Sequence, residues 1–378
     1  MSTAYYYLTP EGKSLAEKLA AGHPGDLYGK ENFKENLQKG FQSYDYLVCI
    51  MATGIVVRIL APLIVHKTSD PGVVVLDQKG QHAISLLSGH LGGANDLARE
   101  MAFLSGGEAV ITTATDVAGE LSFDTFAKKR NMAIENIGKL KHISGALLEG
   151  KAVRVVTDLQ DDELENGKKD GKFILKTVEG FSEEFNHSDP LEFLSKDALS
   201  MAGATSVVDG MPTAEATSVV DGMPTVIIDE GYTLSEEDES RLGAPVLYLR
   251  PRTIFAGIGC KRNMEAAPIE EALLETLKKE GLSPLSLNAI STIPLKADEP
   301  GILTTADHLH VPLKVIPTEE IEALDINELG IKQSDFVAKQ TGVLSVSTAS
   351  SYLASGKGKI LVDKAKFKGI TIALSKMS

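Results

Sequence analysis

Residues 88–95, which read Ser-Gly-His-Leu-Gly-Gly-Ala-Asn, have the types and spacing best suited to chemistry in this chain. Glycines let a backbone approach a ligand and adopt positive φ, and the free N–H groups of a following helix attract carboxylates, phosphates or an oxyanion. His90 can accept or donate a proton near neutral pH. The turn therefore predicts an anion-binding or acid–base site. A tight strand-to-helix connection with a structural histidine is the simpler alternative.

Two other apolar runs end in small polar residues. Residues 47–58 read Leu-Val-Cys-Ile-Met-Ala-Thr-Gly-Ile-Val-Val-Arg, and residues 110–116 read Val-Ile-Thr-Thr-Ala-Thr-Asp. In α/β proteins a ligand site forms from loops at one edge of the sheet. We therefore expect the three loops to collect at a single sheet edge, with Asp116 at the end of its strand.

Strand-like and helix-like periods alternate through the first third of the chain. Strands are expected at 5–8, 46–51, 73–76 and 110–112, and helices at 10–21, 32–41 and 93–105, the last packing Leu97, Ala98, Met101 and Ala102 inward. This alternation predicts parallel pairing in a doubly wound α/β domain at about residues 1–133.

The remaining chain predicts two more domains. Residues 134–246 have short β-branched runs at 153–157 and 173–177 between acidic loops, which indicates a smaller α/β or α+β domain. Residues 247–378 predict a second doubly wound, mainly parallel sheet, with strands at 253–258, 285–291, 313–316, 359–362 and 370–373 and an amphipathic helix at 265–279. Residues 355–359, Ser-Gly-Lys-Gly-Lys, lack the Walker spacing, which excludes an NTPase phosphate loop.

The central segment contains a perfect tandem repeat. Residues 204–213 and 216–225 both read Ala-Thr-Ser-Val-Val-Asp-Gly-Met-Pro-Thr. Two copies are too few for a solenoid, which needs about three repeats to bury its faces. We interpret them as a local duplication, with one copy in the sheet and the other in an exposed loop or extra hairpin.

Two blocks of the sequence resemble one known family. Residues 51–58, Lys67, 70–71, 86–95 and 111–116 resemble the amino-terminal domain of the cobalt-precorrin-5A hydrolase family, CbiG. Residues 255–262, Phe-Ala-Gly-Ile-Gly-Cys-Lys-Arg, with 291–293 and 296–301, resemble its carboxy-terminal, CobE-like domain. The resemblance implies anaerobic cobalamin (vitamin B12) biosynthesis. Family members open the δ-lactone joining the ring A acetate to C20 of cobalt-precorrin-5A, releasing acetaldehyde and giving cobalt-precorrin-5B.

The implied reaction needs an activated water, a base and donors for an oxyanion. We expect His90 as general base or acid, Asp116 as its orienter or as an alternative base, and the N–H groups of Gly92 and Gly93 as oxyanion donors. Ser88 fits a helix-capping or substrate-binding hydroxyl better than a nucleophile. Arg58, Lys67 and Arg262 would pair with carboxylates of the macrocycle. The expected substrate-binding residues are Thr53, Gly54, Arg58, Lys67, Ser88, Gly89, Gly92, Gly93, Asn95, Thr112, Thr113, Thr115, Cys260 and Arg262.

The resemblance implies no metal site and no cofactor of the protein's own, because cobalt arrives in the substrate. A non-catalytic tetrapyrrole-binding protein that hands the macrocycle to a corrin-pathway methyltransferase is the competing function. An unrelated nucleotide-binding protein lacks support, since no Gly-x-Gly-x-x-Gly follows the first strand. The chain departs from the family at Pro294 and at 345–350, where acidic residues are expected. An acid acting there in relatives would have to be replaced by another group.

Composition limits the partners. A formal net charge of −14 over 378 residues argues against a nucleic-acid surface, which leaves Arg58, Lys67, Lys261 and Arg262 as local cations for an anionic ligand. Two cysteines in separate predicted domains indicate no disulfide framework and fit a reducing cytoplasm. Cys49 is expected in the core. Cys260 either closes a turn as a half-buried residue or is a thiol whose pKa the neighbouring cations lower. No export signal or membrane span is expected.

Overall fold

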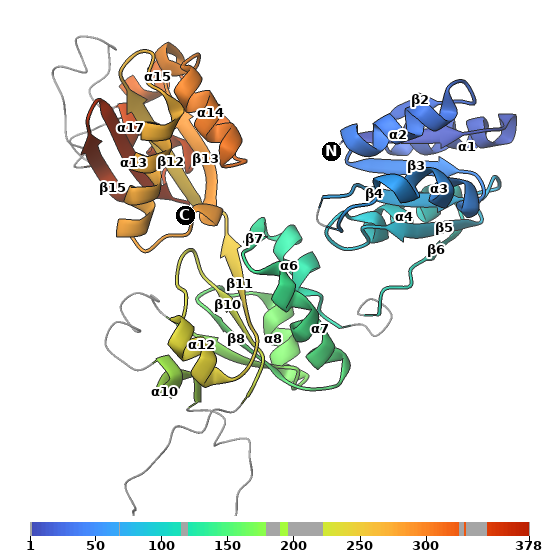
Figure 1. The fold of residues 1–378 in the computed structure, drawn as a ribbon, viewed down its shortest axis with the longest axis horizontal. Helices are drawn as coiled ribbons and strands as arrows, with labels where there is room; N and C mark the ends of the chain where they lie inside the picture. Colours follow the sequence, from blue (N-terminus) through green and yellow to red (C-terminus); the bar gives the residue numbers. More distant parts are fainter. Residues whose placement is uncertain are drawn as a thin grey trace, which may run out of the picture. The chain divides into compact units, whose positions relative to one another are not determined.

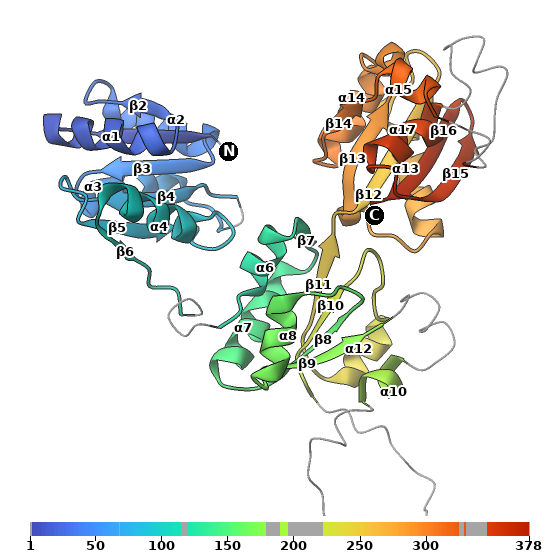
Figure 2. The same ribbon diagram turned by 180° about the vertical axis from the view of Figure 1, so that it is seen from behind.

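The computed structural model describes residues 2–67, 69–114, 120–178, 190–195, 222–324, 329 and 346–377. Two compact units divide the chain: Met1–Lys128 with Leu147–Gly150, and Lys129–Ala146 with Lys151–Ser378. Three sheets with helices around them build these units (Figures 1 and 2). The prediction of a multi-domain α/β protein with mainly parallel sheets is confirmed. The domain boundaries near 133 and 246 stay predictions.

The first sheet has the strand order β2-β1-β3-β4-β5-β6. Its strands are β1 (Thr3–Tyr7), β2 (Asp26–Tyr28), β3 (Tyr46–Ile50), β4 (Gly72–Leu76), β5 (His82–Leu87) and β6 (Glu108–Val110). Every neighbouring pair is parallel except β4 and β5. Strand β6 lies two residues earlier than the strand expected at 110–112. Strand β5 follows β4 after a short turn, in which the Asp77 carboxylate accepts the backbone N–H groups of Lys79 and His82. A tight turn permits only antiparallel pairing.

Helices cover both faces of this sheet. They are α1 (Pro10–Gly22), α2 (Phe33–Ser43), α3 (Thr53–Leu60), followed by the 3-10 turn η1 (Ala61–Leu63), and α4 (Ala94–Ser105). Helices α1 and α4 share one buried cluster with Tyr5 and Val48, whereas α2 and α3 share another with Tyr6 and Cys49. Alternate strand residues therefore point to opposite cores, as a doubly wound sheet requires. The predicted inward face of α4 and the core position of Cys49 are confirmed.

The second sheet has the order β7-β11-β10-β8-β9, and only β7 runs antiparallel to its neighbour. Its elements are β7 (Met132–Ile134), η2 (Ile137–Lys139), α7 (Leu140–Leu148), β8 (Val153–Thr157), α8 (Asp162–Lys169), β9 (Phe173–Thr177), α10 (Pro190–Ser195), β10 (Thr225–Ile228), α12 (Glu236–Leu242) and β11 (Val246–Pro251). The second repeat copy ends at Thr225, the buried first residue of β10. The first copy lies outside the described residues, so its expected loop or hairpin stays a prediction.

The third sheet has the order β14-β13-β12-β16-β15. Its elements are β12 (Ile254–Cys260), α13 (Ala266–Lys279), η3 (Pro284–Ser286), β13 (Leu287–Thr292), η4 (Pro294–Lys296), α14 (Pro300–His308), β14 (Leu313–Val315), α15 (Thr318–Glu322), α17 (Val346–Ala354), β15 (Lys359–Phe367) and β16 (Ile370–Lys376). The first three strands are parallel, and the β15–β16 hairpin adds an antiparallel edge. Helix α13 buries Ile269, Ala272, Leu273 and Leu277, as its spacing predicts.

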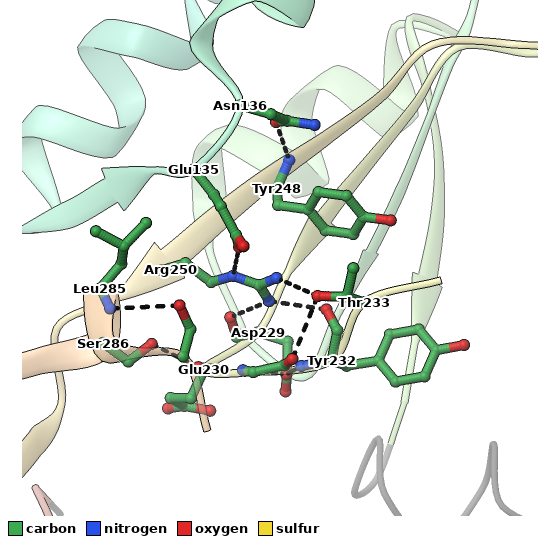
Figure 3. Close-up of polar contacts among 12 residues, drawn as sticks. Glu135, Asn136, Asp229, Glu230, Tyr232, Thr233, Tyr248, Arg250, Leu285 and Ser286 are labelled. Carbon is green, nitrogen blue, oxygen red and sulfur yellow. Dashed lines mark hydrogen bonds and ion pairs between the residues drawn. The ribbon is translucent and has the colours of Figure 1, made fainter. Parts of the chain in front are cut away.

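A buried arginine ties the second sheet to the segments around it (Figure 3). The Arg250 side chain is fully buried and pairs with Glu135. Its Nη1 donates to the carbonyls of Asp229 (3.1 Å) and Tyr232 (2.8 Å), and its Nη2 donates to the Thr233 hydroxyl (2.7 Å). Hydrogen bonds from Nε and both Nη atoms therefore compensate for the burial of the cation. Among the described helices, none is long and apolar enough to cross a membrane.

Candidate active site in the first unit

The glycine turn is closed by its own backbone. The N–H of Gly93 donates to the carbonyl of His90 at 2.9 Å, that of Ala94 to Ser88 at 3.2 Å, and that of Asn95 to Gly89 at 2.9 Å. Ser88 has φ 55° and Gly93 has φ 80°. Because its N–H is already bonded, Gly93 is not the oxyanion donor that the sequence analysis expects. Ser88 closes the turn through its carbonyl, so the helix-capping hydroxyl expected of it is wrong.

Close packing explains two of the glycines. A Cβ on Gly89 would lie 2.6 Å from Oδ1 of Asn95, and a Cβ on Gly92 would lie 2.2 Å from Cβ of Ser88. Asn95 is buried, accepts a hydrogen bond from Ser85 (2.7 Å) and donates one to Thr113 (3.1 Å). The amide thus links β5, α4 and the segment after β6. Hydrogen bonds and close packing therefore hold the turn as a tight strand-to-helix connection, and His90 lies within it.

His90 lies in a polar cluster with two residues that the sequence analysis did not select. Its Nδ1 is 3.2 Å from Oδ2 of Asp124 and 3.2 Å from the hydroxyl of Ser122. The Ser122 hydroxyl also donates to Oδ1 of Asp124. Asp124 belongs to α6 (Phe123–Lys129) and Ser122 directly precedes it. These contacts orient the imidazole through one nitrogen, which is how a carboxylate positions a catalytic histidine.

Burial and hydrogen bonding compete at Asp124. Its side chain is 7% exposed and that of His90 is 13% exposed. Burial alone would raise the pKa of the Asp124 carboxyl, but the hydrogen bonds from His90 and Ser122 outweigh it and lower the pKa below its ordinary value. Asp124 is therefore ionised at neutral pH. An ionised Asp124 favours the tautomer with the proton on Nδ1 of His90, which leaves Nε2 as the basic nitrogen.

The expectation that all three loops share one sheet edge is wrong. Because β5 is antiparallel to β4, the turn after β5 lies at the edge where β3 and β4 begin. Helix α3, with Thr53, Gly54 and Arg58, starts where β3 ends, at the opposite edge. A five-residue strand separates these edges by roughly 15 Å. There Arg58 is exposed and donates to the carbonyl of Gly54 at 2.9 Å.

The segment after β6 does lie at the edge that carries His90, because β6 is parallel to β5. Thr112 follows β6 there, and Thr113 bonds Asn95 as described. Lys67 is exposed in the segment that precedes β4. Thr115 and Asp116 lie outside the described residues. Asp116 therefore stays a prediction, and Asp124 is the carboxylate that the structure places beside His90.

A polar cavity of about 410 Å³ adjoins the glycine turn at Leu91 and Gly92. Lys128 of α6 also lines it, with Nζ 5.9 Å from the ring centre of Tyr46. Burial lowers the pKa of Lys128, against the opposing effect of Asp96 and Asp45. The sequence pattern does not single out Ser122, Asp124 or Lys128. A serine two residues before an aspartate, ahead of a short apolar segment, was the only available signal for that helix start.

The two expected residues of the other unit have different surroundings. Cys260 ends β12, and burial raises the pKa of its thiol to about 11 although Lys296 and Arg262 oppose the change. The interpretation as a thiol with a lowered pKa is wrong. Cys260 is half-buried as expected, but it lies in a strand, paired with Ile370, and not in a turn. Arg262 pairs with Asp298 at 2.8 Å and with Glu299 at 3.1 Å. In the part of the chain that the structure describes, no three His, Cys, Asp or Glu side chains are grouped to hold a metal ion.

Comparison with known proteins identifies the family. Three family models match: Cobalamin synthesis G N-terminal over residues 35–116, Cobalamin biosynthesis central region over 121–190, and Cobalamin synthesis G C-terminus over 254–375. The solved structure of CobE, a protein from the cobalamin biosynthetic pathway, is 28% identical over 34% of this chain and 92% of its own, with a TM-score of 0.32.

Two curated relatives match over most of the chain. The cobalt-precorrin-5A hydrolase of Salmonella typhimurium is 33% identical over 99% of this chain and 97% of its own. That of Priestia megaterium is 31% identical over 89% of this chain and 79% of its own. The family models and these relatives define a cobalamin-biosynthesis protein of the hydrolase class. The chain belongs to the CbiG family, that of the cobalt-precorrin-5A hydrolases.

Proposed function

We propose that this protein hydrolyses cobalt-precorrin-5A, with His90 as general base. The contact of Nδ1 of His90 with the ionised Asp124 carries the proposal, because it leaves Nε2 to accept a proton. The full-length relatives supply the substrate. Their names also favour a catalyst over a protein that only binds and hands over the macrocycle.

The proposed reaction begins with water. His90 takes a proton from it as its oxygen adds to the carbonyl carbon of the δ-lactone between the ring A acetate and C20. The acyl C–O bond then breaks, the C20 oxygen receives the proton from His90, and the acetate is freed as a carboxylate. The bond between C20 and the macrocycle then breaks, and its electron pair stays with the macrocycle, which takes up the proton of the C20 hydroxyl. The two-carbon fragment leaves as acetaldehyde and gives cobalt-precorrin-5B, with a net uptake of one water whose second proton is released with the carboxylate.

The backbone of the same turn supports the developing charge. Among the described residues, the Gly92 N–H donates no hydrogen bond, and Gly92 lines the cavity beside the turn. That group is our candidate oxyanion donor. Lys128, in the same cavity, is our candidate partner for a substrate carboxylate.

The proposal requires no cofactor, because hydrolysis needs only water and the cobalt belongs to the substrate. The product continues to enzymes that modify the corrin ring, so neighbouring methyltransferases of the pathway are the partners that we propose.

Acetaldehyde release from cobalt-precorrin-5A under anaerobic conditions tests the proposal. His90→Ala keeps the glycine turn, so corrinoid binding should persist while the rate falls by about 10²- to 10⁴-fold. His82→Ala is the matched control, because His82 is an exposed histidine at the start of β5, the strand that leads to the glycine turn. The rate of this variant should equal that of the unaltered protein.

Two results would change the assignment of the general base, and a third would change the proposed function. An unchanged rate per bound complex in His90→Ala would show that His90 is structural. A selective rate loss in Asp116→Asn, with His90→Ala active, would move the base to Asp116. If the unaltered protein bound the corrinoid and released no acetaldehyde, the handover function would replace the hydrolase.

A further inference from the structure

A second cavity lies in the other unit, around the end of β12. Its volume is about 710 Å³, within the range of small-molecule sites. Parts of β12, η4, α17 and the β15–β16 hairpin contribute to its walls. Every lining residue belongs to the third sheet or to the segments packed around it. All described lining residues therefore belong to one compact unit.

Five cations line this cavity, and none of the described residues in its lining has a carboxylate side chain. The five are Lys261, Arg262, Lys296, Lys364 and Lys366. The whole chain has a net charge of −14, so this concentration of positive charge is local. An anion entering the cavity therefore meets several cations, and the described part of the lining offers no group that repels it.

Partners outside the lining neutralise only some of these cations. Lys296 pairs with Glu299 at 3.0 Å, and Arg262 pairs with Asp298 and Glu299 as described. Lys261 and Lys366 are exposed, and neither has a carboxylate within ion-pair distance among the described residues. These two ammonium groups remain for a ligand.

Apolar groups form the other part of the lining. Leu295, Val346, Phe367 and Ile370 face the cavity, and Leu295 is 45% exposed. Gly259 and Gly369 add backbone without side chains. A small hydrophilic anion would leave this apolar surface exposed to water. A flat apolar ligand with carboxylates at its rim would cover it while pairing with the lysines.

We propose that this cavity binds a tetrapyrrole-type macrocycle that carries several carboxylates. The choice of macrocycle rests on the proposed function, whereas the cavity itself lies in the other unit from His90. The third sheet thus supplies a binding site of its own for the substrate or product, through Lys261 and Lys366 at the rim and Phe367 and Leu295 against the ring.

Uroporphyrin, an octacarboxylate tetrapyrrole, is the probe, titrated into the full-length protein. Lys261→Ala/Lys366→Ala should weaken its affinity on the order of tenfold, since two charged contacts are lost. Lys278→Ala/Lys368→Ala is the matched control. It removes the same charge from exposed lysines outside the cavity and should change affinity less than about twofold.

The titration also separates ligand classes. Benzenehexacarboxylate offers the carboxylates without the macrocycle and should bind much more weakly. Equal binding of the two compounds would overturn the macrocycle assignment. Equal losses in the two double variants would show only general attraction by surface charge and would overturn the site.

Alkylation of Cys260 locates the ligand. This half-buried thiol lines the cavity, whereas Cys49 is fully buried in the other unit and serves as an internal control. Saturating uroporphyrin should slow labelling of Cys260 by N-ethylmaleimide at alkaline pH, as followed by intact mass. An unchanged labelling rate at saturation would place the probe elsewhere.

The two proposals fail separately. Uroporphyrin has no lactone, so its binding is measured without turnover, and His90→Ala should bind it normally. Loss of acetaldehyde release with intact cavity binding would contradict the proposed reaction only. Acetaldehyde release with no effect of Lys261→Ala/Lys366→Ala on uroporphyrin would contradict the cavity assignment only.

Discussion

Leu87 pairs with Val73 in antiparallel register, and this pairing decides which residues of the first unit can act together. It brings the end of β5 beside the start of β4, so that the glycine turn meets α6 and the Tyr46 end of β3. The Thr53 end of β3 lies at the other edge. The candidate active site therefore uses His90, Asp124 and Lys128 and leaves Arg58 apart.

Arg58→Ala tests this arrangement. Arg58 is exposed and bonds the carbonyl of Gly54, so its loss should change KM for cobalt-precorrin-5A by less than about twofold. Steady-state acetaldehyde release gives the value. A loss of roughly 1.5–3 kcal/mol in substrate affinity, as for a charged hydrogen bond, would show that the substrate contacts that edge too.

The sequence predicted what depends on local period and missed what depends on strand direction and long-range pairing. The face of α4 with Leu97 and Met101 was readable because apolar residues recur every three or four positions. Apolar and polar residues alternate only weakly in β5, and its sequence does not show whether it runs parallel or antiparallel to β4. The contact of Asp124 with His90 joins segments far apart in sequence, and α6 is too short for a periodic signal.

Asp124→Asn should destabilise the first unit at neutral pH, with a loss that disappears in acid. Hydrogen bonds to its carboxylate lower the pKa of Asp124 in the folded protein below its pKa in the unfolded chain. The carboxylate therefore stabilises the native state at pH values above the unfolded-state pKa, and this stabilisation is lost as the pH falls through the folded-state pKa. We expect a cost on the order of 1–3 kcal/mol at pH 7 that shrinks below about pH 4. Urea unfolding of both proteins across this range measures the difference. A pH-independent gap would show that shape, not charge, matters at this site.

Deletion of residues 204–215 tests the duplication. The second copy alone supplies Thr225, which is buried and begins β10, so the sheet keeps its strand. Shortening the connection between α10 and β10 changes closure entropy little. Soluble yield, thermal stability and acetaldehyde release should stay close to those of the full chain. Deletion of residues 225–228 is the control that should abolish folding, and loss of soluble protein in both deletions would show that both copies are structural.

Arg250→Ala should be the most destabilising single change in the second unit. It would leave Glu135 without its partner and remove the donors to the partly buried carbonyls of Asp229 and Tyr232, at a cost of about 1–3 kcal/mol for each acceptor left unsatisfied. Glu135→Gln is the matched control. The Glu135 side chain is 36% exposed and glutamine still accepts the hydrogen bond, so its cost should be below about 1 kcal/mol. Arg250→Lys keeps the charge but not the planar fork and should lie between them. Urea midpoints give the order. Equal midpoints for Arg250→Ala and Glu135→Gln would mean that the three backbone and hydroxyl acceptors contribute nothing, and that the ion pair alone accounts for the effect of Arg250.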